Sequence, residues 1–342
     1  MRASEVSVID FFSGCGGTSA GFKTAGMNIV AGIDSDHDAA ATFRRNFRGS
    51  SFIEADIKTV TTEQVAELIP SEAITLFSGC APCQPFSRQN GHRSLNDPRR
   101  NLLGEFQRFV THLRPHLIVV ENVPGLQSPV QKGPLEEFLK SISSQGYSFE
   151  VGVLRALEYG VPQERRRLVI VASRIGYPVL PPPTHAVGKR RARTVRQAIG
   201  NLPPIRAGEV DERDPDHAAM KLSEANQIRI QATPEGGDRR DWDSSLVPDC
   251  HVVHGGHTDA YGRMWWDRPA TGLTTRCLSY SNGRFGHPEQ DRAISLREAA
   301  CLQTFSRRFR FEGSLTSRGR QVGNAVPPLM ARRIGEALIQ PL

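Results

Sequence analysis

Short runs of apolar and β-branched residues alternate with helix-like stretches over residues 1–174, and this alternation constrains the fold most. The strand-like runs are Val6–Phe12, Asn28–Ile33, Ser51–Ile53, Ile74–Phe77, Leu117–Val120, Phe149–Leu154 and Leu168–Ala172. Helix-like stretches lie between several of them, at Ser19–Ala25, Asp36–Phe47, Thr62–Ile69, Leu102–Leu113 and Leu135–Ser144. The pattern predicts an α/β fold with a doubly wound sheet of about seven strands, whose ligands bind at the carboxyl ends of the strands.

The pattern breaks at a proline-rich segment, Pro178–Thr184, which predicts a domain boundary. From there to about residue 291 the chain is rich in Gly, Pro and Arg and has little periodicity, so we expect a smaller, irregular domain. A helical pattern returns at Leu296–Leu302 and at Pro328–Leu338.

Charge is distributed unevenly along the 342 residues, whose net charge is +7. Residues 1–174 carry 19 basic and 18 acidic side chains, whereas residues 175–342 carry 24 basic and 18 acidic. The excess predicts that the second half meets a polyanion, although a GC-rich genome also explains an arginine-rich composition. With 38% hydrophobic and 23% charged residues, the composition excludes general disorder.

Targeting features are lacking in the sequence. No apolar stretch is long enough to span a bilayer, and MRASEVSVID at the start has no apolar secretory region. Six cysteines at irregular spacing do not form a disulfide framework, so we expect a reducing cytoplasm.

Polar groups follow the first three strands. The first strand runs into DFFSGCGG (residues 10–17), whose glycines allow a sharp turn close to a ligand, although Ser19 replaces the third glycine of G-x-G-x-x-G. A plain tight turn is the alternative. Asp34 ends the second strand, where a carboxylate can accept both ribose hydroxyls, and Asp56 follows the third, near an adenine amino group. Together they predict a nucleoside cofactor.

Cys80 and Cys83 follow the fourth strand and allow three hypotheses. A redox disulfide is disfavoured because Pro82 blocks helix just before the second cysteine. A zinc site would need further ligands, for which Cys250, His251, His254 and His257 are the candidates, although such a turn is more often a polar, substrate-facing loop. The third hypothesis is a nucleophilic cysteine in a rigid loop.

Two more polar groups border the later strands. The fifth strand delivers Glu121 and Asn122 at its carboxyl end, where a carboxylate projects into the active crevice unless it only caps a helix or forms a salt bridge. Gln163–Arg167 enters the seventh strand. An arginine cluster is usually solvated, but this one enters a buried strand, so at least one arginine is expected to face the crevice.

In this order the residues resemble the cytosine-C5 DNA methyltransferase family. The matching blocks are DFFSGCGG (10–17), Asp34, Asp56-Ile57, GCAPCQPFS (79–87), NDPRRNLL (96–103), ENV (121–123), QERRR (163–167), LREAACLQTF (296–305) and GRQVGNAVPP (319–328). Only residues 180–290 lack the resemblance, where family members carry a variable target-recognition region. Cys301 and Thr304 depart from the usual Arg and Gly, and the Cys-Phe-Thr signature of a tRNA-modifying branch is not found.

The resemblance implies a Rossmann-like methyltransferase that uses S-adenosylmethionine, yields S-adenosylhomocysteine and needs no metal. Residues 1–180 plus 315–342 would form its catalytic domain, and 181–314 its target-recognition domain. The implied cofactor contacts are Phe12, Gly14, Gly16, Gly17, Asp34, Asp56, Ile57, Leu102 and Asn324. The implied catalytic residues are Cys83, Pro82, Glu121, Asn122, Arg165 and Arg167. Cys83 would add to C6 of the cytosine, with Glu121 at N3 and Arg167 at O2.

The target base must leave the duplex, because its reacting atoms are inaccessible in stacked DNA. We expect Gln84–Arg100 to act as a lid on DNA, with Gln84, Ser87, Gln89 and Arg93 as contacts, and Arg239, Arg240, Arg263, Arg276 and Arg284 as candidate base readers. The expected partner is double-stranded DNA, with a restriction endonuclease acting separately. We expect a monomer associated with the bacterial nucleoid and not with a membrane. The alternatives are a tRNA methyltransferase, an NAD oxidoreductase and a non-enzymatic relative.

Overall fold

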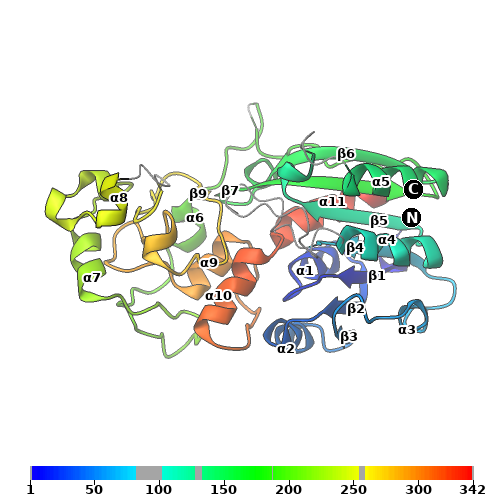
Figure 1. The fold of residues 1–342 in the computed structure, drawn as a ribbon, viewed down its shortest axis with the longest axis horizontal. Coiled ribbons are helices and arrows are strands. Elements are labelled where there is room, and N and C mark those ends of the chain that lie inside the picture. Colours follow the sequence, from blue (N-terminus) through cyan, green and yellow to red (C-terminus); the bar gives the residue numbers. More distant parts are fainter. Residues whose placement is uncertain (1, 82–101, 128–132, 187, 254–258, 341–342) are drawn as a thin grey trace. The chain divides into compact units, whose positions relative to one another are not determined.

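The computed structural model describes residues 2–81, 102–127, 133–186, 188–253 and 259–340, which form two compact units (Figure 1). The first unit consists of Met1–Tyr159, Arg166–Thr184 and Val326–Leu342, and the second of Gly160–Arg165 and His185–Ala325. The predicted division, with a catalytic part at 1–180 plus 315–342, differs from these units at residues 160–165 and 315–325, which belong to the second unit, and at 181–184, which belong to the first.

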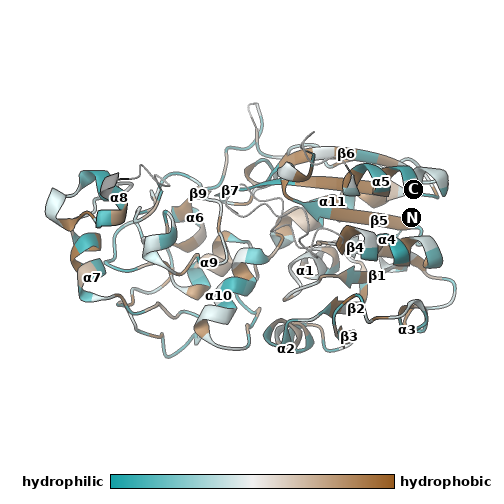
Figure 2. Cartoon of the chain, viewed as in Figure 1, coloured by the Kyte–Doolittle hydropathy of each residue, from teal (hydrophilic) through white to brown (hydrophobic). Residues whose placement is uncertain are grey.

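The first unit contains a seven-stranded sheet, as predicted. Its strands are β1 (Val6–Phe11), β2 (Asn28–Asp34), β3 (Ser51–Glu54), β4 (Ile74–Gly79), β5 (Leu117–Asn122), β6 (Ser148–Arg155) and β8 (Arg166–Ser173), in the order β3-β2-β1-β4-β5-β8-β6. The first five pair in parallel, whereas β8 pairs antiparallel with both β5 and β6. Hydrophobic residues concentrate along the central strands, as Figure 2 shows.

The helices of the first unit are α1 (Gly17–Thr24), α2 (His37–Asn46), α3 (Thr62–Ala66), α4 (Leu102–Leu113), α5 (Pro134–Ser144) and α11 (Pro328–Ile339). The predicted helices are confirmed within a few residues at their ends. Successive strand residues face opposite sides of the sheet. On one side, the ring of Phe11 packs against two others. Its centroid lies 5.1 Å from that of Phe77 and 5.3 Å from that of Phe106 in α4. On the other side, Asp10 meets Ser19 of α1.

The last helix of the chain, α11, packs on the first. A Cβ at Gly21 of α1 would lie 2.4 Å from the carbonyl oxygen of Pro328, so only glycine allows this approach. The expectation that the end of the chain folds back on the first domain is thereby met.

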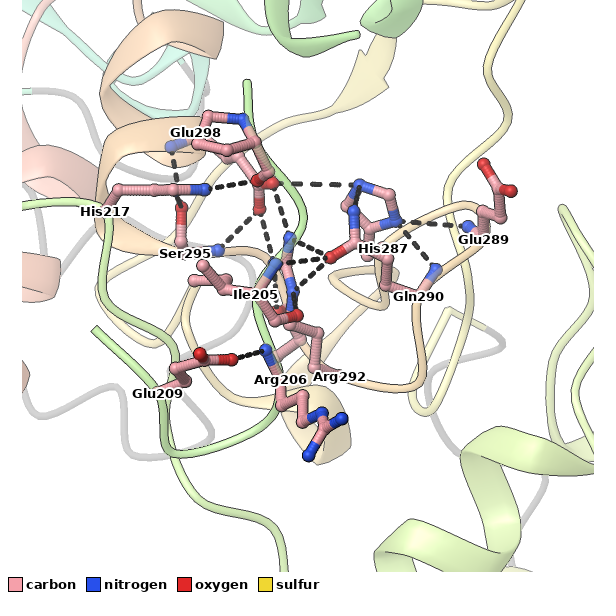
Figure 3. Close-up of polar contacts among 12 residues, drawn as sticks. Ile205, Arg206, Glu209, His217, His287, Glu289, Gln290, Arg292, Ser295 and Glu298 are labelled. Carbon is pink, nitrogen blue, oxygen red and sulfur yellow. Dashed lines mark hydrogen bonds and ion pairs between the residues drawn. The ribbon is translucent and has the colours of Figure 1, made fainter. Parts of the chain in front are cut away.

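The second unit has short elements and much irregular backbone. They are α6 (Val195–Ile199), α7 (Glu224–Gln231), α8 (Asp249–Val253), α9 (Leu296–Leu302), α10 (Leu315–Asn324), β7 (Gln163–Glu164) and β9 (Ala270–Thr271). Buried ion pairs help to hold it: Arg292, fully buried, donates to both carboxylate oxygens of Glu298 at 2.7 Å and to the carbonyl of Ile205 at 2.9 Å (Figure 3). Ser295 caps α9 through the amide of Glu298.

Candidate active site

The site lies where the sheet changes direction. From β1 the chain adds β2 and β3 on one side, and then returns to add β4 and β5 on the other. Ligands of open α/β sheets bind at the carboxyl ends of the strands at such a switch point. The predicted cofactor and catalytic groups of the first unit follow the carboxyl ends of β1, β2, β3, β4 and β5.

The turn after β1 adopts conformations that favour glycine. Gly14 has φ +51° and Gly16 has φ +89°, and a Cβ at Gly16 would lie 2.5 Å from the ring of Phe47. Phe12 also adopts a left-handed backbone, with φ +54°, although it is not glycine. Strain of this kind is concentrated at ligand sites in proteins.

The carboxylate of Asp34 is fixed by this turn. Its Oδ2 accepts the amide N–H of Gly14 at 2.8 Å, and its Oδ1 accepts that of Asp36 at 2.9 Å. Burial raises the pKa of this carboxyl. Each oxygen keeps a further lone pair, so the oriented carboxylate can accept the two hydroxyls of a ribose.

Three predicted cofactor contacts share one apolar cluster. Ile57 and Leu102 are buried in it, and the half-buried Phe12 packs against it. Asp56 is exposed, and its Oδ1 accepts the amide of Lys58 at 3.0 Å. Phe12 thus follows β1, Asp56 and Ile57 follow β3, and Leu102 begins α4.

Glu121 and Arg167 meet at the carboxyl end of β5. Arg167 Nε lies 2.6 Å from Glu121 Oε1, and both side chains are largely buried. The N–H of Arg167 Nε does not point at Glu121 Oε1 closely enough for a hydrogen bond, so the contact is an ion pair. Asn122 next to Glu121 donates from Nδ2 to the carbonyl of Ala81 at 3.2 Å. Glu121, Asn122 and Arg167 thus gather beside the segment that leads to Cys83.

Cys80 carries a half-buried thiol. Its Sγ lies 3.5 Å from Thr18 Oγ1. Burial, with a smaller effect from the charges of Glu121 and Asp10, raises the pKa of the thiol well above its usual value. A thiol of this kind is a poor nucleophile.

Asp10 is a buried acidic residue that the sequence analysis gave no role. It is fully buried at the end of β1 and accepts the hydroxyl of Ser19 at 2.6 Å. Ser78 occupies the opposed position on β4. Burial raises the pKa of the Asp10 carboxyl to about 6. An acidic residue inside a mostly apolar strand was the signal that could have identified it.

Arg165 and Asn324 belong to the second unit. Arg165 is buried and donates from Nη1 to the carbonyls of Leu273 at 3.0 Å and Gly323 at 3.2 Å. Its Nη2 lies 3.5 Å from the carbonyl oxygen of Asn324, whose side chain is exposed. Arg165 therefore holds the end of α10 in place.

Most of the candidate base-reading arginines have partners within the second unit. Arg263 and Arg284 are buried: Arg263 donates to carbonyls including those of Thr233 and Ile230, and Arg284 pairs with Asp238 at 2.9 Å. These two hold turns together and do not present a guanidinium to a base. Arg239 is buried, Arg240 pairs with Asp238 at 2.7 Å, and Arg276 is exposed.

Several predicted residues lie outside the described part of the chain: Pro82, Cys83, Gln84, Ser87, Gln89, Arg93, His254 and His257. Within the described ranges, no three His, Cys, Asp or Glu side chains form a group that could hold a metal ion. Over the same ranges, no helix has the length and apolar character needed to cross a membrane.

Comparison with known proteins identifies the family. The model for "C-5 cytosine-specific DNA methylase" matches residues 6–340. Type II methylase M.HgiDII of Herpetosiphon aurantiacus is 40% identical over 338 residues, covering 97% of this chain and 94% of the relative. Type II methyltransferase M1.HphI of Haemophilus parahaemolyticus is 33% identical over 338 residues, covering 98% and 87%.

Solved structures share the fold. A prophage-encoded E. coli protein named as a DNA modification methyltransferase superimposes with a TM-score of 0.78 at 23% identity, covering 98% of this chain and 99% of that one. The Dnmt2 methyltransferase of S. pombe has a TM-score of 0.60 at 18% identity, covering 98% of each chain. The predicted Rossmann-like fold and the predicted resemblance are therefore confirmed, and the chain belongs to the C-5 cytosine-specific DNA methylase family.

Proposed function

We propose that this enzyme transfers a methyl group from S-adenosylmethionine to C5 of a cytosine that has left the DNA duplex, with Cys83 as the nucleophile. The observation that carries the proposal is the pair of Glu121 and Arg167, 2.6 Å apart and largely buried, beside the segment leading to Cys83. A carboxyl group and a guanidinium in such a place match the N3 and O2 edge of a cytosine.

The first unit has groups that fit the cofactor. Asp34 would accept the ribose hydroxyls, because two backbone amides already orient its carboxylate. Phe12, Ile57 and Leu102 would line the adenine side, and Asp56 would meet its amino group. Gly14, Gly16 and Gly17 would let the backbone approach closely. The bound cofactor supplies an electrophilic methyl group.

The residues of the chain supply the remaining chemistry. The Cys83 thiolate adds to C6, which makes C5 enamine-like and therefore nucleophilic. Glu121 provides a proton or hydrogen bond at N3 as electrons move into the ring, and Arg167 binds O2. After methylation, loss of the C5 proton to water expels the thiolate and restores the aromatic ring. Arg165 acts as a positioning residue through the end of α10.

Double-stranded DNA is the proposed substrate, and a restriction-modification system the proposed setting. Two observations support this: the matching family acts on DNA, and the relatives at 40% and 33% identity are named a Type II methylase and a Type II methyltransferase. Under this proposal a cognate endonuclease acts on the same sequence as a separate protein. The enzyme works as a monomer near the bacterial nucleoid.

Nucleoside mass spectrometry tests the proposal directly. DNA and tRNA are incubated separately with the enzyme and S-adenosylmethionine, digested and analysed. We expect 5-methylcytosine in DNA only, and bisulfite sequencing then gives its sequence context. Methylation confined to tRNA, or absent from both, would refute the proposal.

A further inference from the structure

The arginines of the second unit fall into two groups, those neutralised by carboxylates and those that are not. The first group includes Arg240 and Arg284 with Asp238, Arg263 with Asp291, Arg292 with Glu298, Arg297 with Asp214 and Arg196 with Asp267. Because each of these arginines lies beside a carboxylate, the ion pairs contribute little net positive charge to the binding of a polyanion. The excess positive charge of this half of the chain must therefore come from other residues.

Arg190, Arg191 and Arg193 stand out in the second group, and they lie in one cationic segment, Lys189–Arg193. Its sequence is KRRAR, and no acidic residue occurs in the chain between Glu164 and Glu209. Arg190 and Arg191 are exposed and Arg193 is half-buried. Among the residues that the structure describes, no carboxylate lies within ion-pair distance of these three arginines. Their charge is therefore available to a partner.

The segment is held at both ends. Before it, His185 lies against the backbone at Gly160, where an added Cβ would be 2.8 Å from the imidazole. After it, Thr194 caps α6, and the amide of Val195 donates to the carbonyl of Arg268 at 2.9 Å. Residues 188–194 form neither helix nor strand. Because both ends are fixed, the segment loses less conformational entropy when it binds a partner.

Duplex DNA presents what these side chains would bind, namely one negative charge per roughly 1.7 Å of helix axis. A guanidinium donates two parallel hydrogen bonds to a phosphate. Five residues span at most roughly 16 Å, a length that can face more than one phosphate. We infer that Lys189–Arg193 binds the phosphate backbone of the substrate DNA and adds affinity without reading sequence. The inference rests on the proposed function, because it takes DNA as the substrate.

The test is a triple variant, Arg190→Gln, Arg191→Gln and Arg193→Gln, whose affinity for duplex DNA is measured by fluorescence anisotropy over a range of NaCl concentrations. Each lost phosphate contact should make the slope of log K against log salt less negative by about 0.9. For three contacts we expect a change of about 2.7. The affinity should fall equally for cognate and unrelated duplexes.

A matched control removes three exposed charges of the first unit that pair with no carboxylate among the described residues: Lys23→Gln, Arg48→Gln and Lys58→Gln. This control should keep the wild-type slope, and both variants should keep the wild-type unfolding midpoint and affinity for S-adenosylmethionine. An unchanged slope in the Arg190/Arg191/Arg193 variant, or an equal change in the control, would overturn the inference while leaving the methylation of DNA intact. Failure of the wild type to bind DNA would refute the proposed function itself.

Discussion

The ionisation of Asp10 links its burial to the stability of the first unit. Burial raises its pKa to about 6, and the groups that oppose this rise are the hydroxyls of Ser19 and Ser78 and the amide of Ser19. In the unfolded chain the pKa of the Asp10 carboxyl is about 4. The folded state therefore binds a proton at this carboxyl more tightly than the unfolded state does. The resulting stabilisation is fully present below about pH 4 and is lost as pH rises through 6.

Asp10→Asn should remove this pH dependence. A difference of about two pKa units corresponds to at most about 3 kcal/mol, so the variant should gain stability relative to wild type between pH 4 and pH 7. Urea unfolding of both proteins across this range measures the difference. Ser19→Ala is the matched control, because loss of its hydroxyl should move the wild-type dependence to higher pH. Parallel curves for wild type and Asp10→Asn would contradict the prediction.

Asp34→Ala should weaken cofactor binding more than DNA binding. The variant loses acceptors for two ribose hydroxyls, an effect of roughly 1.5–3 kcal/mol. Calorimetry with S-adenosylmethionine should show a Kd higher by about 10- to 150-fold, whereas the affinity for duplex DNA should stay near that of wild type. Unchanged cofactor affinity would show that Asp34 only supports the turn at Gly14.

Glu121→Gln should separate chemistry from binding. Glutamine keeps the size of the side chain but cannot deliver a proton to N3, so the adduct at C6 would carry uncompensated charge. Loss of a general acid typically costs about 10²- to 10⁴-fold in rate. The loss should appear in single-turnover methyl transfer and not in DNA affinity. A rate within about threefold of wild type would give Glu121 a structural role only.

At the scale of elements, two buried glutamines fix the end of α10. Gln303 donates from Nε2 to the carbonyls of Val322 at 2.7 Å and Ala325 at 3.1 Å. Its Oε1 accepts from Gln163 Nε2 at 3.0 Å. Both glutamine side chains are fully buried. They satisfy carbonyl groups that the end of a helix leaves without a partner in the helix.

Gln303→Leu should destabilise the protein by about 1–3 kcal/mol, because it leaves buried polar groups without their partners. Urea unfolding measures the change. Gln231→Leu, at an exposed position of α7, is the matched control and should change stability by no more than about 0.5 kcal/mol. Equal stability of the two variants would contradict the role given to Gln303.

The helices and strands of the first unit could be predicted because their periodicity is strong, as α4 shows with bounds equal to those expected. In the second unit, α6, α7, α8 and α10 were missed: α6 and α8 have only five residues each, α7 is largely polar, and glycines interrupt α10. The structure explains why glycine is usual at the position of Thr304 and makes the threonine strained. Its φ is +68°, a left-handed backbone that favours glycine.

At the scale of the whole molecule, composition predicted a basic second half but not which arginines carry its free charge. Arg263 and Arg284 look like DNA contacts in the sequence, yet their partners, such as Asp291 and Asp238, lie far along the chain. Pairing at such separations depends on the tertiary fold. The fold itself was predictable because ordered motifs span almost the entire length, and the family match from residue 6 to residue 340 agrees with them.

The central claim is that Cys83 attacks C6 of a cytosine in DNA, and trapping with 5-fluorocytosine tests it most directly. With fluorine at C5 there is no proton for a base to remove from that carbon. The elimination that would expel the thiolate is therefore blocked, and the adduct persists after methyl transfer. We predict that wild type with S-adenosylmethionine and substituted duplex DNA gives a covalent complex that survives denaturation. Cys80→Ser should give the same complex, because the pKa of that thiol is raised well above its usual value, whereas Cys83→Ser should give none. No complex with wild type, or an undiminished complex with Cys83→Ser, would contradict the claim.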